Sequence, residues 1–268
     1  MNHEELQKNL RELSLHGIAK EYPELSRIAE KKNCTYEQFI GMLATVEIKS
    51  RAELKVKRLT KDSKIPLLKE QSTYDFKCIK GITEIEFNRL AEGAFLNNAT
   101  NIVLYGSFGL GKTHLSIALS RKLIEKGYRC FYTTTHNLIQ DLLEAQKTLK
   151  LGAIFKKLDK YQLLVCDELG YIPQTKDGAD LFFQLISQRN ERKSILITTN
   201  LPFSDWGQVF VNPLNTAAAV DRIIHNCETF NLEGPSYRTV EAKKRHELKT
   251  SLTVKNKATI STPSTGPF

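Results

Sequence analysis

The sequence contains no hydrophobic run long enough to cross a membrane and no cysteine pattern typical of a disulfide framework. No stretch approaches the ~20 consecutive apolar residues that a membrane-spanning helix needs. The five cysteines are odd in number and widely spaced, and without a Cys-x-x-Cys pair neither disulfide bonds nor a zinc site is indicated. The first residues, Met-Asn-His-Glu-Glu-Leu, lack the basic and apolar regions of a secretory signal. We therefore expect no membrane association and a protein of the reducing cytoplasm.

Acidic residues are too few to balance the basic ones. The 268 residues include 39 lysines and arginines against 30 aspartates and glutamates, a formal net charge of +9. A hydrophobic content of 41% is ordinary for a globular protein with one sizeable core and a small extra module. The charge fits either a solvated basic surface or a surface that binds a polyanion such as nucleic acid. Composition alone favours neither alternative.

The chain is organised around residues 101–113. Residues 102–105 form a short apolar run typical of a buried strand, and residues 106–113 match G-x-x-x-x-G-K-[ST], the P-loop pattern. The glycines allow the backbone to turn sharply and bring its N–H groups close to phosphate oxygens. A helical pattern follows, and the N-terminus of a helix favours anions. We expect Lys112 to reach the β- and γ-phosphates and the Thr113 hydroxyl to ligate Mg²⁺.

A glycine-rich turn can match this pattern by accident, but the preceding strand and the following helix favour nucleotide binding. ATP and Mg²⁺ are therefore the cofactors that the sequence predicts. The expected contacts with ATP come from the loop and the first helical residues: Gly106, Ser107, Phe108, Gly109, Leu110, Gly111, Lys112, Thr113 and His114.

Polar residues close two further apolar runs. Residues 163–166 are apolar and are followed by Asp167 and Glu168. Alone, this pattern equally fits a strand that ends in a polar turn. Downstream of a P-loop, we expect Asp167 to support Mg²⁺ and Glu168 to orient and deprotonate the attacking water. The run 194–199 ends at Asn200, which either caps a turn or, as the order along the chain favours, contacts the γ-phosphate.

Strand and helix patterns alternate from residue 101 to about residue 235, which predicts a parallel α/β sheet. Gly127 stands where a glycine commonly ends a helix. We therefore predict an α/β fold with a five-stranded parallel sheet flanked by helices. The expected strands are 102–105, 128–133, 162–166, 194–199 and 227–232, and the expected helices are 112–126, 136–149, 178–190 and 216–226.

Residues 1–75 are predicted to form a small all-helical N-terminal domain. Thr35 and Gln38 resemble a capping box before a helix, and Pro23 interrupts the helical pattern upstream of it. We expect the domain to bind DNA or a partner protein. Apolar residues at helical spacing form two stripes, at Leu6, Leu10 and Leu13 and at Tyr36, Phe39, Ile40, Leu43 and Val46.

Basic residues gather in segment 49–69, which holds eight of them against Glu53 and Asp62. Such a run is either a solvated helix face, a stripe that contacts phosphates, or a contact between subunits. The segment has no aromatic residue that could stack on single-stranded bases, which favours duplex DNA. The candidate DNA-binding residues are Arg51, Lys55, Lys57, Arg58 and Lys61.

The second predicted domain covers residues 76–240, and a tail covers residues 241–268. Phe76 either packs at the domain boundary or lies near the adenine. The tail is first basic and then rich in serine and threonine, a composition that buries too little apolar surface to order itself alone. We therefore expect a disordered tail.

Several motifs, in their order along the chain, resemble those of the IstB family. This family comprises helper ATPases of insertion-sequence transposition, related to the DnaC helicase loaders within the AAA+ ATPases. The resemblance covers about residues 1–240. It rests on G-S-F-G-L-G-K-T-H-L, L-L-V-C-D-E-L-G-Y, Q-R-N-E-R-K-S-I-L-I-T-T-N-L-P-F, V-D-R-I-I-H and G-P-S-Y-R. Ser107-Phe108 replaces the proline-containing turn usual in this loop, and Cys166 replaces a β-branched residue.

The resemblance implies an AAA+ core and a homo-oligomer in which each ATP site is completed by an arginine of the next subunit. Arg222 matches that arginine finger; the alternative is a surface arginine anchored by Asp221. Arg189 is a more remote alternative. Arg238 is a candidate second sensor that contacts the nucleotide.

The resemblance also implies sequence-independent binding of double-stranded DNA and a transposase as partner. The predicted function is therefore an ATP-hydrolysing regulator that assembles on duplex DNA and helps a transposase engage its target. One alternative is a replicative helicase loader, similar to DnaC, that acts with single-stranded DNA. Another is a DNA-coating scaffold whose ATPase only times assembly.

Overall fold

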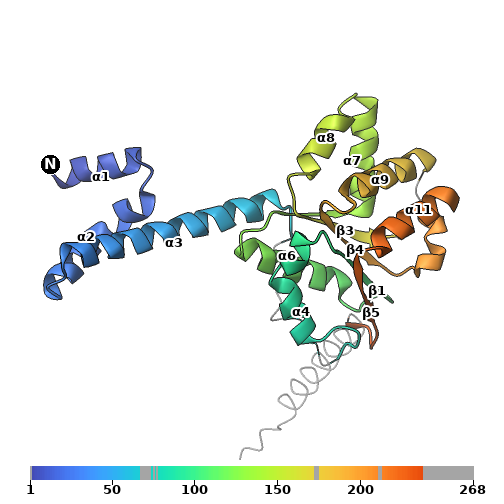
Figure 1. The fold of residues 1–268 in the computed structure, drawn as a ribbon, viewed down its shortest axis with the longest axis horizontal. Helices are drawn as coiled ribbons and strands as arrows, with labels where there is room; N and C mark the ends of the chain where they lie inside the picture. The colour runs from blue at the N-terminus through green and yellow to red at the C-terminus, as the bar shows by residue number, and fades with distance from the viewer. Residues whose placement is uncertain are drawn as a thin grey trace, which may run out of the picture.

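The chain folds into a helical arm and an α/β body (Figure 1). The computed structural model describes residues 2–66, 74, 76, 78–171, 175–210 and 213–237. We call α1–α3 the arm; its helices are α1 (His3–Glu12), α2 (His16–Lys31) and α3 (Tyr36–Asp62). The expected tail, residues 241–268, lies outside the described residues. None of the helices in the described part is both long and apolar enough to cross a lipid bilayer.

The body is built on a parallel sheet of five strands in the order β2-β3-β4-β1-β5. Because all five strands run in the same direction, their carboxyl ends meet at one edge of the sheet. The strands are β1 (Asn101–Gly106), β2 (Cys130–Thr134), β3 (Leu163–Leu169), β4 (Ser194–Thr199) and β5 (Cys227–Leu232).

Helices cover both faces of the sheet, so the strands are apolar on both sides. Ile102 and Leu104 of β1 point into one core, which α4 and α6 cover, whereas Val103 points into the other, which α7, α9 and α11 cover. This double burial explains why the strands appear in the sequence as continuous apolar runs. The helices of the body are α4 (Glu84–Ala91), α5 (Ala94–Asn97), α6 (Lys112–Glu125), α7 (Thr135–Lys147), α8 (Leu151–Leu158), α9 (Lys176–Arg189), α10 (Gly207–Phe210) and α11 (Pro213–Ile224).

The predicted five-stranded parallel sheet and the helical region that precedes it are confirmed, and three local predictions need correction. The third strand runs on to Leu169 through a register shift after Cys166. The helix expected at 136–149 ends at Lys147, and α8 is an additional helix. Pro23 does not interrupt a helix, because α2 continues through it.

The arm tolerates Pro23 because its local hydrogen bonding is rearranged. A proline has no N–H to donate to the carbonyl four residues earlier, which here belongs to Ala19. The side-chain amide of Gln7, on α1, lies 3.5 Å from that carbonyl oxygen and donates to it. In α3, the predicted capping box of Thr35 and Gln38 is confirmed.

Glu47 is a buried acid that joins α2 to α3. Its carboxylate accepts the backbone N–H groups of Gly17 at 2.9 Å and Ile18 at 3.1 Å, and it accepts the Arg51 guanidinium at 2.8 Å. Burial alone would raise the pKa of Glu47, but these hydrogen bonds outweigh burial and hold the pKa below its ordinary value. The ionised form therefore stabilises the arm above the unfolded-state pKa, and this contribution is lost as the pH falls through the lowered pKa.

We predict that Glu47→Ala loosens the start of α2. Two amide groups lose their acceptor, which costs about 1–3 kcal/mol of local stability. Hydrogen exchange of the Gly17 and Ile18 amides should accelerate in the variant. Glu53→Ala is the control, because Glu53 is an exposed acid of the same helix. Equal exchange in the two variants would contradict the role of Glu47.

Candidate functional site

The loop between β1 and α6 forms a cradle of closely approached backbone. Gly109 and Gly111 both have φ of +80°, in the left-handed region that favours glycine. A Cβ atom on Gly109 would lie 2.2 Å from the Ser236 hydroxyl oxygen, and one on Gly111 would lie 2.6 Å from the Tyr74 ring. No side chain among the described residues caps the N-terminus of α6 at Gly111. The glycine backbone and these uncapped amides fit the phosphate groups of a nucleotide.

Lys112 and Thr113 begin α6 and turn toward the loop and toward β3. The Lys112 side chain is 5% exposed, and its ammonium donates to the carbonyl oxygens of Gly106 at 2.6 Å and Ser107 at 2.8 Å. The Thr113 hydroxyl donates to Asp167 Oδ1 at 3.0 Å. The structure therefore brings together the two halves of the predicted site.

Asp167 is a buried carboxylate held by three hydroxyl groups. Its side chain is 1% exposed, and Oδ1 accepts a second hydrogen bond, from Thr198 at 2.5 Å. Oδ2 accepts the phenol of Tyr132 at 2.5 Å. Burial raises the pKa of Tyr132, and the nearby charges of Asp167 and Glu168 raise it further, so the phenol stays protonated and donates.

Glu168 and Asn200 end the two neighbouring strands. Glu168 is exposed, and its backbone has φ of +63°, which is unusual for a residue other than glycine. Asn200 is half-buried, and its side-chain oxygen is buried without a hydrogen-bond partner among the described residues. A buried acceptor without a partner fits a contact with a water molecule at the site.

Aromatic residues border the loop on two sides. The Tyr74 hydroxyl donates to the Leu110 carbonyl at 3.2 Å, and the Tyr74 ring lies edge-on to His114 with centroids 5.5 Å apart. Phe76 packs between Tyr74 and Phe87, with centroid distances of 4.8 and 5.6 Å, against the core that α4 and α6 cover. Of Tyr74 and Phe76, Tyr74 is the one that contacts the loop. Burial raises the pKa of the Tyr74 phenol.

On the outer side of the loop, Phe108 packs edge-on against Tyr171, with centroids 5.2 Å apart. The backbone after β5 also reaches the loop, because the Tyr237 N–H donates to the Gly109 carbonyl at 2.9 Å. Arg238 follows directly but lies outside the described residues.

The two arginines considered for a neighbouring site differ in burial. Arg222 is half-buried on α11, where it donates to the Ala218 carbonyl at 3.0 Å and lies over the Phe183 ring. Within the described residues it forms no ion pair with Asp221. Arg189 is 2% exposed and donates to backbone carbonyls at the end of α8 and the start of β4. Burial lowers the pKa of Arg189 to about 10. Arg189 is therefore held by backbone carbonyls inside the body.

The candidate DNA-binding residues on α3 fall into two groups. Arg51 bonds to Glu47, and the Lys55 ammonium lies over Gly127, where an added Cβ would be 2.7 Å away. Lys57, Arg58 and Lys61 are exposed and make no ion pair or side-chain hydrogen bond with other described residues. Two of the five candidates, Arg51 and Lys55, therefore already contact other groups of the chain.

The sequence analysis did not identify Tyr74, Tyr132 or Thr198 as site residues. Tyr132 and Thr198 lie near the carboxyl ends of β2 and β4, the two strands that flank β3. Their position beside Asp167 depends on strand order and register. Polar residues near the ends of predicted parallel strands are the one signal that could have indicated them.

Comparison with known proteins gives consistent matches. The model of the family described as IstB-like ATP binding protein matches residues 8–246. An insertion sequence ATP-binding protein of Sinorhizobium fredii is 35% identical over 240 residues, which cover 88% of this chain and 80% of that protein. The insertion sequence IS21 ATP-binding protein of Pseudomonas aeruginosa is 33% identical over 240 residues, which cover 90% and 91%.

The fold also resembles a solved structure. The crystal structure of DnaI matches with a TM-score of 0.51 and 20% identity, covering 64% of this chain and 91% of that one. At this identity the likeness concerns the fold alone. It confirms the predicted α/β fold with a five-stranded parallel sheet.

We predict that Gly109→Ala weakens nucleotide binding. The new methyl group would clash with Ser236 and would require a left-handed alanine. Gly152→Ala is the matched control, because nothing lies within 4 Å of a Cβ at that helical position. Binding of a fluorescent ATP analogue should fall by at least ~10-fold in the first variant, since 1.4 kcal/mol of strain corresponds to tenfold, and should be unchanged in the second. Wild-type affinity in Gly109→Ala would contradict the cradle.

Proposed function

This chain belongs to the family of IstB-like ATP-binding proteins, and from that membership we propose that it hydrolyses ATP with Mg²⁺ while assembled on double-stranded DNA. In this proposal it helps a transposase to engage target DNA. The observation that best supports hydrolysis is the pair of acidic residues near the carboxyl end of β3. Asp167 is buried beside Thr113, whereas Glu168 is exposed to solvent. One acid is thus suited to support a cation and the other to accept a proton from water.

The residues of the loop have distinct roles in this proposal. The glycine backbone and Lys112 bind the phosphates of ATP and orient the terminal one. Thr113 and Asp167 would hold Mg²⁺, which would neutralise phosphate charge. No group of three or more His, Cys, Asp or Glu among the described residues is arranged to hold a metal alone. A site with so few protein ligands fits Mg²⁺, which would take its other ligands from phosphate oxygens and water. Glu168 accepts the proton of the attacking water, and Asn200 positions that water.

We propose that Arg222 completes the ATP site of a neighbouring subunit. Support comes from its side chain, which among the described residues contacts a backbone carbonyl and the Phe183 ring rather than an acid. A guanidinium that no carboxylate neutralises keeps its charge available for phosphate oxygens. Arg238 is proposed as a second contact with the nucleotide, since the preceding Tyr237 bonds to the phosphate loop.

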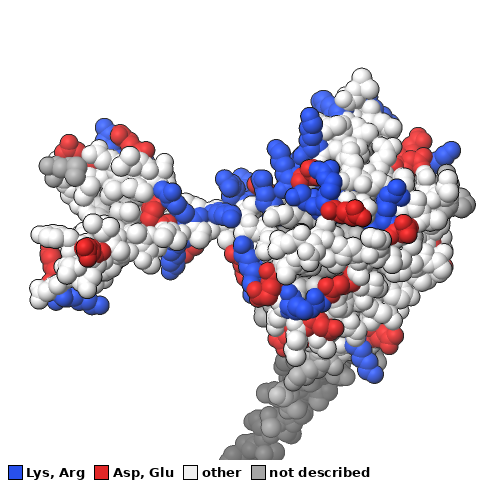
Figure 2. Space-filling view, viewed as in Figure 1, with Lys and Arg blue, Asp and Glu red and all other residues white. Residues whose placement is uncertain are grey.

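Duplex DNA is the proposed polyanion. Figure 2 shows Lys and Arg side chains gathered where the arm meets the body, over the end of α3 and over α8. Lys57, Arg58 and Lys61 are exposed on α3, and Lys156 and Lys157 are exposed on α8. Lysines and arginines that neutralise phosphates supply affinity without sequence preference.

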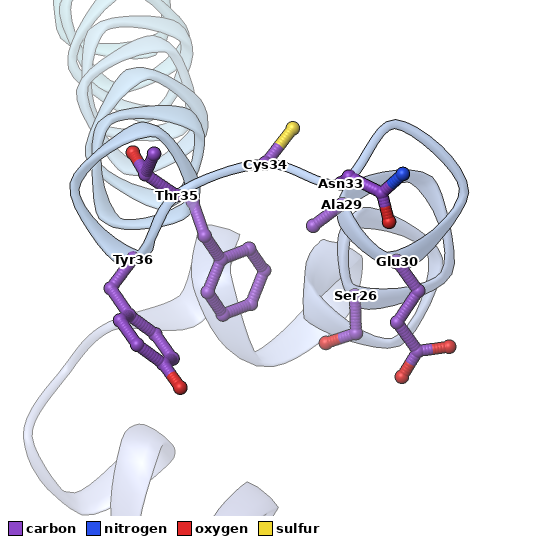
Figure 3. Close-up of a pocket in the computed structure, with 8 residues that line it drawn as sticks. Ser26, Ala29, Glu30, Asn33, Cys34, Thr35 and Tyr36 are labelled. Atoms are coloured by element: carbon purple, nitrogen blue, oxygen red, sulfur yellow. The ribbon is translucent and has the colours of Figure 1, made fainter.

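The arm tip is the part of the chain best suited to a protein partner such as a transposase. Tyr36 is 90% exposed and Ile40 is 63% exposed on the same turns of α3. Next to them, Ser26, Glu30 and Tyr36 border a pocket of about 350 Å³ between the ends of α2 and α3 (Figure 3). Exposed apolar side chains beside a hollow are typical of surfaces that bind other proteins.

The central prediction is that duplex DNA stimulates ATP turnover. Stimulation should fade as salt rises, and Lys112→Ala and Arg222→Ala should each lower kcat, the latter by about 10³-fold. Because the arginine acts on a neighbouring site, mixing the two variants should restore part of the activity. Stimulation by single-stranded DNA alone would favour the helicase-loader alternative. No recovery on mixing would contradict a shared site.

A separate prediction concerns the basic surface. Replacing Lys57, Arg58 and Lys61 together by alanine should weaken duplex binding. The slope of log affinity against log salt should fall by about 0.9 for each phosphate that the variant no longer neutralises. The control removes the same charge from the arm at Lys8, Lys31 and Lys32, which are exposed. Equal weakening in the two triple variants, measured by fluorescence anisotropy, would show that net charge and not this surface binds DNA.

A further inference from the structure

We propose that the hydroxyl group of Thr198 is a positioning group that fixes Asp167 and Glu168 together and couples them to the strand that carries Asn200. This role rests on the proposed hydrolysis of ATP. It assigns a function to a buried threonine whose hydroxyl bonds to both acidic residues.

Thr198 makes one hydrogen bond to each of the two acids. Its hydroxyl donates to Asp167 Oδ1 at 2.5 Å and accepts the backbone N–H of Glu168 at 2.9 Å. A carboxylate only accepts and an amide N–H only donates, whereas a hydroxyl has one proton and free lone pairs. A single hydroxyl therefore satisfies both partners at once. Its side chain is 1% exposed, so water does not compete for either bond.

The backbone at Glu168 needs this support. The pairing between β3 and β4 shifts register between Cys166 and Leu169, and Glu168 stands inside this irregularity with φ of +63°. An inserted residue of this kind loses its regular partner in the sheet and redirects its side chain. The Thr198 hydroxyl accepts the N–H that the sheet leaves unpaired. Thr198 thus stabilises the bend that presents the Glu168 carboxylate to solvent.

Thr198 also transmits position between strands. It lies on β4, two residues before Asn200. A shift of the end of β4 therefore acts on both acids through one side chain, and a shift of the acids acts on Asn200. Thr198 therefore links the groups that are proposed to hold Mg²⁺, to activate water and to contact the terminal phosphate.

Thr199 provides a matched control in the neighbouring position. Its side chain is also 1% exposed, and its hydroxyl also makes two hydrogen bonds. It donates to the Leu169 carbonyl at 2.9 Å and accepts the Leu201 N–H at 3.0 Å. Thr199 contacts neither acid through these bonds, so its loss reports the structural cost of removing a buried hydroxyl from this strand.

The experiment compares Thr198→Val, Thr198→Ser and Thr199→Val in the full chain. Thr198→Val should lower kcat and raise the Mg²⁺ concentration for half-maximal binding of a fluorescent ATP analogue, each by about 10- to 100-fold, as for other residues that orient a metal ligand. Affinity for the analogue in EDTA should be unchanged. Thr198→Ser keeps the hydroxyl and should restore both quantities. Hydrogen exchange at the Glu168 amide should accelerate only in Thr198→Val.

The outcomes separate this role from the proposed function. Equal changes in Thr198→Val and Thr199→Val would show that Thr198 acts only on stability and would overturn the proposal. An unchanged Mg²⁺ requirement in Thr198→Val would also overturn it. If the wild-type protein binds ATP but does not hydrolyse it, hydrolysis fails as a function. The Mg²⁺ titration and the Glu168 exchange rate then still decide the role of Thr198.

Discussion

The body is held together at its functional edge by one buried carboxylate. An ionised acid out of contact with water is costly unless hydrogen-bond donors surround it. Asp167 obtains its donors from three different elements, through Thr113 of α6, Tyr132 of β2 and Thr198 of β4. Satisfying this one charge therefore fixes the phosphate loop, the second strand and the fourth strand relative to the third. The strand order places β2 and β4 on either side of β3, and without that order the carboxylate could not be satisfied.

A feature of this protein can be predicted from the sequence when the residues that form it lie close together along the chain. Lys112, Thr113 and Asp167 belong to short patterns whose spacing alone indicates their chemistry. The structure places Thr113 in contact with Asp167 and Lys112 in contact with the phosphate loop. The parallel sheet follows from apolar runs that are buried on both faces. Tyr132 and Thr198 belong to no pattern, because their closeness to Asp167 comes from register between strands far apart in the sequence. The left-handed turn at Glu168 is likewise invisible in a run of residues that appears as an ordinary strand.

The basic segment 49–69 shows that sequence spacing is also limited in what it predicts about charged residues. The spacing i, i+4, i+7 puts Arg51, Lys55 and Arg58 on one face of a helix, but spacing does not reveal which charges already have partners. Arg51 pairs with a buried acid of its own helix, and Lys55 rests on the end of α6. Arg58, further along the same helix, is exposed where the arm meets the body. Pro23 gives a comparable case, because a side chain from another helix supports the carbonyl that the proline leaves unpaired.

Tyr132 joins the arm to the acid cluster in one residue. Its backbone N–H donates to the carbonyl of Ser63, the residue that caps the end of α3, at 2.8 Å. Its phenol, on the same residue, donates to Asp167 at 2.5 Å. The base of a helix of 27 residues is thus one side chain away from the carboxylate. The end of the long arm helix and the buried carboxylate are therefore anchored to the same residue of β2.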